Sequence, residues 1–339
     1  QLRAEHSVNV RLIVDHLPSF SRIAPQVDPG LPRQNVAGIE VFDWSESLVS
    51  PLPADLVIEA FACELPGHYL QCMAQRSVPS QWINLEYLSA EPWVADHHLL
   101  PSPHPRLPLV KYFFFPGFTP DSGGLIREHG LSTGMRPDDI ETDSLLRLFV
   151  FAYENAPVGT LVSAIENSRQ RACMTLPGSD AQDKLKRWRG LQAENALETP
   201  PMLEFSFPEF VPQLEFDAVL RAHDVLFVRG EDSFVRAQWA AKPFVWQIYP
   251  QADGAHWVKL DAFLDLYCEG LAAEASRALR AMWRAWNGAE QRELPAAWNG
   301  FLQHRAALRE HAIGWAGKLM LMPDLASNLL SFYKKNAKI

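Results

Sequence analysis

A short turn in the second half of the chain carries residues suited to holding a phosphate group. The run 224–241, DVLFVRGEDSFVRAQWAA, starts as an apolar strand-like stretch and continues as a helix-like one. Gly230 permits a sharp turn, and Glu231–Ser233 stand where the helix should begin, with Ser or Asp as its N-cap. Free N–H groups at such a helix start attract anions, and Arg229 could add a bidentate contact. A structural turn with a capped helix and a surface arginine explains the same residues equally well.

Other aromatic and polar residues close neighbouring apolar runs: Phe151, Tyr153, Phe210, Gln213, Tyr249 and Gln251. Phe210 could stack on a nucleobase, a contact worth on the order of 1–3 kcal/mol, and Gln213 could hydrogen-bond the edge of that base. Tyr249 ends the strand-like run that follows the turn, so a parallel sheet would bring it to the same edge. Packing in the core is the competing interpretation of each aromatic residue.

The first half offers fewer candidates. Glu86 is an unusual carboxylate on an otherwise apolar run, and it could orient an acceptor or act as a base. Gly117 and Phe118 lie in a loop that leaves room for close backbone approach. The histidines of the proline-rich stretch 97–104 have no metal-ligand spacing, so we expect a solvated loop and no metal site.

These residues need elements to position them, and the whole chain alternates short apolar runs with helical patterns. This order predicts an α/β fold with mostly parallel sheets, whose ligands bind at the carboxyl ends of the strands. Strands are expected at 10–14, 56–60, 82–86, 110–115, 145–153, 172–175, 202–205, 225–228 and 244–248. Helices are expected at 67–76, 154–168, 233–241, 258–270, 272–287, 296–313 and 324–336, and the proline-rich segment 99–108 is expected to be loop. A Gly-, Pro- and Asp-rich stretch at 116–144 suggests two domains, 1–144 and 145–318, with a cleft between them.

Composition limits the partners. The net charge of −9 argues against a nucleic-acid-coating protein, which would normally be basic. The four scattered cysteines fit a reduced, cytoplasmic protein, and we find neither a signal peptide nor an apolar run long enough for a membrane helix. The chain begins at Gln1 with what looks like the end of a helix, so we expect a preceding segment.

Six blocks of sequence together carry a family resemblance. They are NLEYLSAE (84–91), KYFFFPGFT (111–119), GGLIRE (123–128), FAYEN (151–155), RGEDSFVRAQWA (229–240) and PFVWQIYPQ (243–251). In this order they resemble the EarP family, the protein-arginine rhamnosyltransferases of bacterial translation elongation factor P (EF-P). The resemblance covers nearly the whole chain. It implies an inverting GT-B glycosyltransferase with two Rossmann-like domains, the first lacking its first strand here, and with residues 319–339 returning to that first domain.

The resemblance also implies substrates and residue roles. Rhamnose would move from dTDP-β-L-rhamnose to one arginine of EF-P without a metal or other cofactor, activating EF-P for rescue of ribosomes stalled at polyproline. Phe151 and Phe210 match residues that embrace the thymine, and Gln213 matches one that contacts the base. The positions near the diphosphate are Tyr153, Arg229, Asp232 and Ser233, while Tyr249 and Gln251 fall in a donor-side block. Glu231 matches a glutamate important for activity, and Glu86, Gly117 and Phe118 are expected on the acceptor side.

One family feature is missing from the sequence. The family begins with a strand and an Asp-Asn-x-Gly-Asp loop whose aspartates are catalytic, and nothing of that form precedes the helix at Gln1. We therefore expect the general base to lie outside these residues. Two alternatives stay open: another GT-B enzyme, such as a nucleotide-sugar epimerase or a small-molecule glycosyltransferase, and a non-catalytic protein that binds the elongation factor.

Overall fold

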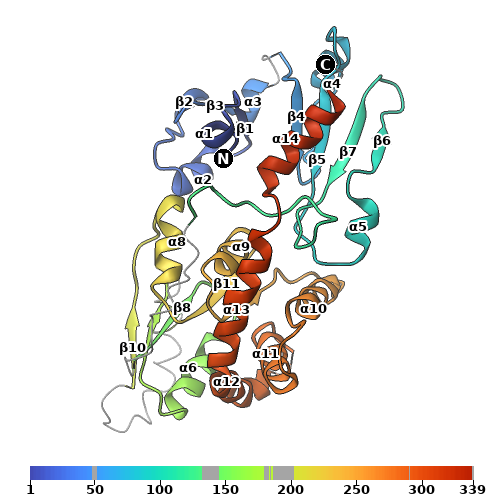
Figure 1. Cartoon of the computed structure of the whole chain (residues 1–339). Coiled ribbons are helices and arrows are strands. Elements are labelled where there is room, and N and C mark those ends of the chain that lie inside the picture. The colour runs from blue at the N-terminus through green and yellow to red at the C-terminus, as the bar shows by residue number, and fades with distance from the viewer. Residues whose placement is uncertain are drawn as a thin grey trace. The chain divides into compact units, whose positions relative to one another are not determined.

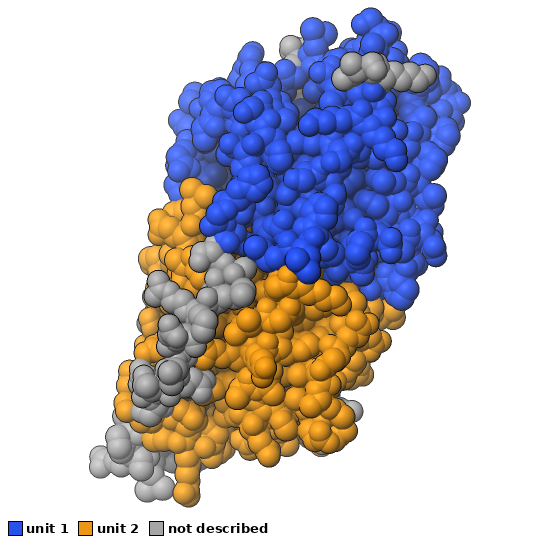
Figure 2. Space-filling model, in the orientation of Figure 1, with its two compact units in different colours: residues 1–131, 320–339 blue, residues 132–319 orange. Residues whose placement is uncertain are grey.

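The computed structural model of the protein describes residues 1–47, 52–131, 145–178, 183, 185, 202–289 and 291–337. The chain forms two compact units, residues 1–131 with 320–339, and residues 132–319 (Figure 2). The sequence predicted the first boundary at 144, and residues 132–144 lie outside the described residues.

Unit 1 holds two small sheets (Figure 1). Its elements are α1 (Leu2–His6), β1 (Arg11–Val14), α2 (Leu17–Ile23), β2 (Arg33–Val36), β3 (Ile39–Asp43), α3 (Trp44–Ser47), β4 (Leu56–Ala60), α4 (Gly67–Gln75), β5 (Gln81–Leu85), α5 (Trp93–His97), β6 (Pro101–Pro103), β7 (Val110–Phe114) and α14 (Leu325–Asn336). One sheet has the order β1-β3-β2 and the other β4-β5-β7-β6. In each, one outer strand, β2 or β6, is antiparallel to its neighbour and the others are parallel.

Several elements of unit 1 were not predicted from the sequence, among them the short helices α2, α3 and α5 and three strands. Strands β2 and β3 pair as a hairpin that the sequence did not predict, because β2 (RQNV) lacks the apolar character that marks a buried strand. Strand β6 lies inside the segment 99–108, for which we expected only loop. It pairs with β7 at the sheet edge, where proline is tolerated because its missing N–H need not face a partner.

The sheet β4-β5-β7-β6 is covered on both faces. On one face α14 contributes Leu325, Leu329 and Phe332, which pack with Ile83 and Phe114. On the other face lie Tyr69 and Met73 of α4, packed with Val57, Trp82 and Leu109. The alternation of side chains along each strand sends these two sets to opposite faces. The C-terminal helix is therefore part of the core of unit 1.

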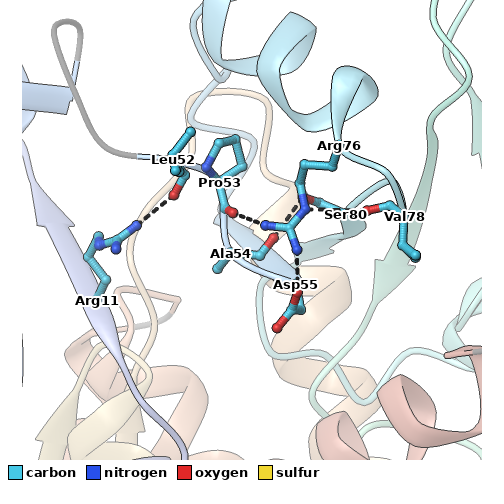
Figure 3. Close-up of polar contacts among 8 residues, drawn as sticks. All are labelled: Arg11, Leu52, Pro53, Ala54, Asp55, Arg76, Val78 and Ser80. Atoms are coloured by element: carbon cyan, nitrogen blue, oxygen red, sulfur yellow. Dashed lines mark hydrogen bonds and ion pairs between the residues drawn. The ribbon is translucent and has the colours of Figure 1, made fainter. Parts of the chain in front are cut away.

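An arginine at the end of α4 fixes the approach to β4 (Figure 3). The guanidinium of Arg76 donates to the carbonyl of Pro53 and to the carboxylate of Asp55. From β1, Arg11 donates to the carbonyl of Leu52 at 2.9 Å. These contacts hold the segment before β4 from two sides.

Unit 2 is a parallel α/β layer structure. Its elements are β8 (Leu146–Val150), α6 (Val158–Asn167), β9 (Ala172–Thr175), β10 (Leu203–Ser206), α8 (Gln213–Arg221), β11 (Val225–Arg229), α9 (Asp232–Trp239), β12 (Phe244–Gln247), α10 (Ala255–Tyr267), α11 (Ala273–Trp286), the short 3₁₀ helix η2 (Gln291–Glu293), α12 (Leu294–Gln303) and α13 (Arg305–Met320). The stretch expected as one helix at 296–313 belongs to two helices, α12 and α13, which are separated at His304.

The sheet of unit 2 has the order β10-β9-β8-β11-β12, and every neighbouring pair is parallel. Numbered within the unit, this is the order 3-2-1-4-5 of the Rossmann fold. The strands are buried on both faces, as shown by Leu226 and Phe227, which are both 0% exposed. The order reverses between β8 and β11, and open α/β sheets bind ligands at the carboxyl ends of the strands at such a switch point.

Candidate functional site

The switch point of unit 2 brings together the two segments that the sequence analysis singled out. Strand β8 ends at Val150 and leads to Phe151 and Tyr153, while β11 ends at Arg229. The pairing of Phe227 with Val150 sets this register, and the N–H of Phe151 donates to the carbonyl of Phe227 at 2.9 Å. The two strand ends are therefore held side by side by the sheet itself.

Arg229 lies across both aromatic rings. Its guanidinium carbon is 4.4 Å from the centre of the Phe151 ring and 4.7 Å from that of Tyr153. Cation–π contacts at these distances orient a guanidinium without using up its N–H donors. The donors of Arg229 can therefore serve an anion at the carboxyl edge of the sheet.

The turn after β11 is shaped for close approach. Gly230 has φ +65°, and a Cβ atom there would lie 3.3 Å from the hydroxyl of Tyr153. Its carbonyl accepts a hydrogen bond of 2.7 Å from the indole N–H of Trp246. A glycine is needed here both for the left-handed backbone and for the space that Tyr153 occupies.

The N-cap of helix α9 is not the Asp or Ser that the sequence suggested. Its N-cap is Glu231, whose side chain makes no capping hydrogen bond. The buried hydroxyl of Ser233 instead donates to the carbonyl of Arg229 and lies 3.3 Å from the N–H of Arg229. The first-turn N–H groups of α9 thus lack a cap from Glu231, and such groups suit an anionic ligand.

A second set of contacts ties helix α8 to this turn. Gln213, the first residue of α8, donates to the carboxylate of Asp232 at 2.7 Å. One helical turn further on, the buried Arg236 lies 3.3 Å from Asp217 and 3.8 Å from Asp232. The loop that carries Phe210 precedes α8 directly, so these contacts fix the aromatic loop relative to the turn between β11 and α9.

Phe210 is presented as an exposed ring. It is 63% exposed, and its ring centre lies 6.2 Å from that of Phe151 in an edge-to-face arrangement. Below it, Gly178 has φ +91°, and a Cβ atom there would come within 2.7 Å of the Phe210 ring. The glycine therefore allows the exposed ring to lie against the backbone of the turn at residue 178.

The end of β12 supplies the third edge of the site. The ring of Tyr249 is 65% exposed and packs edge-on against Tyr153, with centres 5.6 Å apart. Gln251 is exposed, and its N–H donates to the ring of His256 at 3.1 Å. Burial raises the pKa of the Tyr153 phenol, and the nearby Arg229 opposes part of that rise. The Tyr153 hydroxyl therefore stays protonated at neutral pH and can donate a hydrogen bond.

One supporting residue was not predicted from the sequence. Gln247 is 1% exposed at the end of β12, and its side-chain oxygen Oε1 accepts a hydrogen bond from the backbone N–H of Tyr153 at 2.7 Å. Its amide group donates to Asn155 at 3.1 Å. A glutamine inside the apolar run FVWQI was a usable signal, because a buried amide needs partners. Gln247 holds the backbone after β8 in place.

The acceptor-side candidates lie in unit 1. The N–H of Glu86 donates to the carbonyl of Phe114 at 2.9 Å, and its carboxylate accepts from the amide of Asn84. The N–H of Gly117 donates to the carbonyl of Gly124 at 3.2 Å. Phe118 is only 4% exposed. Glu86 is therefore placed at the carboxyl edge of the sheet, while Gly117 and Phe118 lie in a buried loop.

Among the residues that the structure describes, no group of three His, Cys, Asp or Glu side chains could hold a metal ion. Every helix within the described parts of the chain is too short or too polar to span a bilayer.

A comparison with solved structures identifies the class of enzyme to which this fold belongs. The chain can be superposed on a solved structure that concerns EarP-mediated arginine glycosylation of translation elongation factor EF-P. The TM-score is 0.60 at 27% identity, over 97% of this chain and 98% of that one. Two α/β units with parallel strands and this structural match define a glycosyltransferase of the GT-B type.

The family follows from the sequence comparisons. Residues 1–334 match the family described as Elongation-Factor P (EF-P) rhamnosyltransferase EarP. The protein-arginine rhamnosyltransferase of Pseudomonas putida is 40% identical, over 99% of this chain and 93% of its own length. That of Pseudomonas aeruginosa is 39% identical, over 98% and 92%. This chain belongs to the EarP family, and the resemblance seen in the six sequence blocks is confirmed.

Proposed function

We propose that this protein transfers rhamnose from dTDP-β-L-rhamnose to one arginine side chain of EF-P, with inversion at the anomeric carbon. The observation that carries the proposal is the Arg229 guanidinium, held on Phe151 and Tyr153 beside the start of α9 in a member of the EarP family. This arrangement suits a diphosphate leaving group at a Rossmann switch point. Because translation is a cytoplasmic process, the proposal places the reaction in the cytoplasm.

The base of the donor would lie between Phe210 and Phe151, with Gln213 at its edge. The two rings stand at 75° to one another, so one can stack on a pyrimidine while the other meets its edge. Gln213 is directed by Asp232, whose carboxylate fixes the glutamine amide. Asp232 would act in this way, through Gln213, because a carboxylate in direct contact with a diphosphate would be repelled.

The diphosphate would be held by Arg229, by the first N–H groups of α9 and by the hydroxyl of Tyr153. The buried Ser233 supports this part of the site by bonding the backbone of Arg229. Tyr249 and Gln251, at the end of β12, would face the sugar side of the donor. These groups supply the positive electrostatic environment that a metal ion provides in many other phosphate-handling enzymes, so we expect chelation by EDTA to leave the rate unchanged.

The chemistry is a single displacement. A guanidinium nitrogen of the acceptor arginine attacks the anomeric carbon, forming a C–N bond while the bond from that carbon to the diphosphate oxygen breaks. The electron pair of the broken bond leaves with dTDP, and Arg229 with α9 stabilises the charge that develops there. The attacking nitrogen loses a proton to a carboxylate base, since a guanidinium with a pKa above about 12 is a poor nucleophile. We propose that Glu231 acts beside this centre, at the N-cap of α9.

On the acceptor side we propose Glu86, Gly117 and Phe118. Glu86 can face an arginine directly, because its carboxylate lies at the carboxyl edge of the unit 1 sheet. Gly117 and Phe118 act by shaping their loop, since Phe118 is buried. A Cβ atom at Gly117 would come within 2.7 Å of Ser122, so any larger residue would displace the loop.

The test is incubation of the full-length enzyme, including the segment expected to carry the catalytic aspartates, with dTDP-β-L-rhamnose and unmodified EF-P, followed by intact-mass analysis. We expect EF-P to gain the mass of one deoxyhexose residue, on an arginine and with α configuration by NMR. EF-P with that arginine replaced by lysine is the control and should gain nothing. An unchanged mass of EF-P would refute the proposal. So would a calorimetric titration in which UDP- and GDP-sugars bind as tightly as dTDP-rhamnose.

A further inference from the structure

Unit 1 contains a left-handed backbone segment that the site described above does not use. Directly after β4, Phe61, Ala62 and Glu64 have φ of 55°, 53° and 52°. For residues with a Cβ atom this conformation costs roughly 1–2 kcal/mol each. Neighbouring structure must hold it, and such strain concentrates at functional positions.

The restraints on this segment are hydrogen bonds to β5. The N–H of Phe61 donates to the carbonyl of Leu85 at 2.9 Å, and that of Ala62 donates to the side chain of Asn84 at 3.0 Å. Asn84 is 1% exposed, and its amide donates in turn to the carboxylate of Glu86. One buried asparagine thus fixes both the left-handed segment and Glu86.

The result is an exposed pair of aromatic rings. Phe61 and Tyr87 stack with their centres 4.6 Å apart and their planes at 27°. They are nevertheless 47% and 53% exposed, so the pair forms an apolar platform rather than a part of the core. Two large rings that stack outside the core at the carboxyl edge of a parallel sheet indicate a ligand-binding position.

The charge beside the platform is negative. Glu86 adjoins Tyr87 in the chain, and Glu64 is exposed on the left-handed segment. Nearby, Glu59 is buried and already has partners, Lys111 at 3.6 Å and the indole of Trp82 at 2.9 Å. Lys111 is thus paired with Glu59, while Glu64 and Glu86 add two further carboxylates to the segments that carry the rings. Aromatic faces next to carboxylates suit a guanidinium, because a guanidinium stacks on rings and donates bidentate hydrogen bonds to carboxylates.

We infer that the Phe61–Tyr87 platform, with Glu86, docks the arginine-bearing loop of the acceptor protein. The inference deepens the proposed function and rests on it, since it takes the acceptor to be an arginine of EF-P. The guanidinium of the acceptor arginine lies on the rings and meets Glu86. The left-handed backbone serves to hold the Phe61 side chain against Tyr87.

The experiment measures transfer to EF-P with Phe61→Ala, Tyr87→Ala and Glu86→Gln, at saturating dTDP-rhamnose. We expect each to raise the KM for EF-P by about 5- to 30-fold, which corresponds to about 1–2 kcal/mol, with kcat changed by less than about threefold. The Kd of dTDP-rhamnose should be unchanged. Phe61→Tyr should restore the KM, because it restores the ring. Val78→Ala, at a 70% exposed residue of the same unit, is the matched control and should behave as the wild type.

A folding defect is separated from a docking defect by Phe61→Gly. Glycine adopts a positive φ without a clash, so this variant should unfold at no lower temperature than Phe61→Ala while showing the same raised KM. A double-mutant cycle pairs Phe61→Ala with EF-P whose acceptor arginine is alanine, and the affinity of the two proteins is measured by biolayer interferometry. The two changes should be non-additive if the ring and the arginine loop touch.

The outcomes distinguish this inference from the proposed function. Transfer of rhamnose with an unchanged KM and affinity in Phe61→Ala and Tyr87→Ala would overturn the inference and leave the function standing. Affinity for EF-P that depends on Phe61, without any transfer by the wild type, would support the platform and refute the function. A raised Kd for dTDP-rhamnose would assign the platform to the donor and overturn the inference.

Discussion

Arg229 allows the sharpest test of the donor site. Replacing it with alanine removes the guanidinium that lies 4.4 Å and 4.7 Å from two ring centres, and with it the charged donors for the diphosphate. A hydrogen bond to a charged group contributes about 1.5–3 kcal/mol, so kcat/KM for the donor should fall about 10- to 150-fold. Arg229→Lys keeps the charge but loses the planar stacking. Its kcat/KM for the donor should therefore lie between those of Arg229→Ala and the wild type.

The assay is the initial rate of EF-P modification, followed by intact mass at several donor concentrations. Arg277→Ala is the matched control, because the Arg277 side chain is 70% exposed and forms a surface ion pair with Glu274 of the same helix, at 3.1 Å. Surface pairs of this kind contribute about 0–1 kcal/mol to stability, so the control should keep its rate. The reasoning is refuted if Arg229→Ala retains kcat/KM within about threefold of the wild type, since one charged contact should exceed that.

Three further predictions concern stability and pH. Gly230→Ala should cost about 1–2 kcal/mol and weaken donor binding, because Gly230 has φ +65° and the new Cβ would lie 3.3 Å from the hydroxyl of Tyr153; an unchanged urea midpoint would contradict this. Burial lowers the pKa of His98 to about 4, below its unfolded value of about 6.5, so the unfolded state binds more protons between these values. The free energy of unfolding should therefore fall as the pH drops through that window. In His98→Asn the urea midpoint should depend less on pH over the same range. Phe332→Ala should cost about 3 kcal/mol in urea unfolding, because Phe332 packs in the core of unit 1, whereas Leu321→Ala, at an 87% exposed residue, should cost less than about 0.5 kcal/mol.

The sequence predicted the elements of unit 2 well, because each signal there is local. The run VLFVR reads as a buried strand without tertiary information, and Gly-Glu-Asp-Ser marks a turn into a helix. The hairpin of β2 and β3 escaped prediction because the polar strand RQNV gains its structure from pairing with β3. The split between α12 and α13 escaped because helical periodicity continues across His304.

For the candidate site, too, the local sequence could not show which side chains come together. Phe151, Tyr153 and Arg229 were each selected from the sequence, but core packing was the stronger interpretation of both aromatics on composition alone. The structure adds the parallel register, which sets Phe227 beside Val150 and so places Arg229 over both rings. Register depends on the order of strands in the sheet, and that order is a property of the assembled core.

Both units present left-handed backbone at the carboxyl edge of a parallel sheet, but with different residues. In unit 2 the position is Gly230, where the absence of a side chain lets Tyr153 and a ligand approach the turn. In unit 1 the positions include Phe61, which accepts the cost of a positive φ and keeps its side chain. A glycine at 61 would remove the strain and the aromatic ring together. Under the two proposals, the turn at Gly230 would therefore act through its backbone, whereas the segment at Phe61 would act through the side chain that its left-handed backbone holds in place.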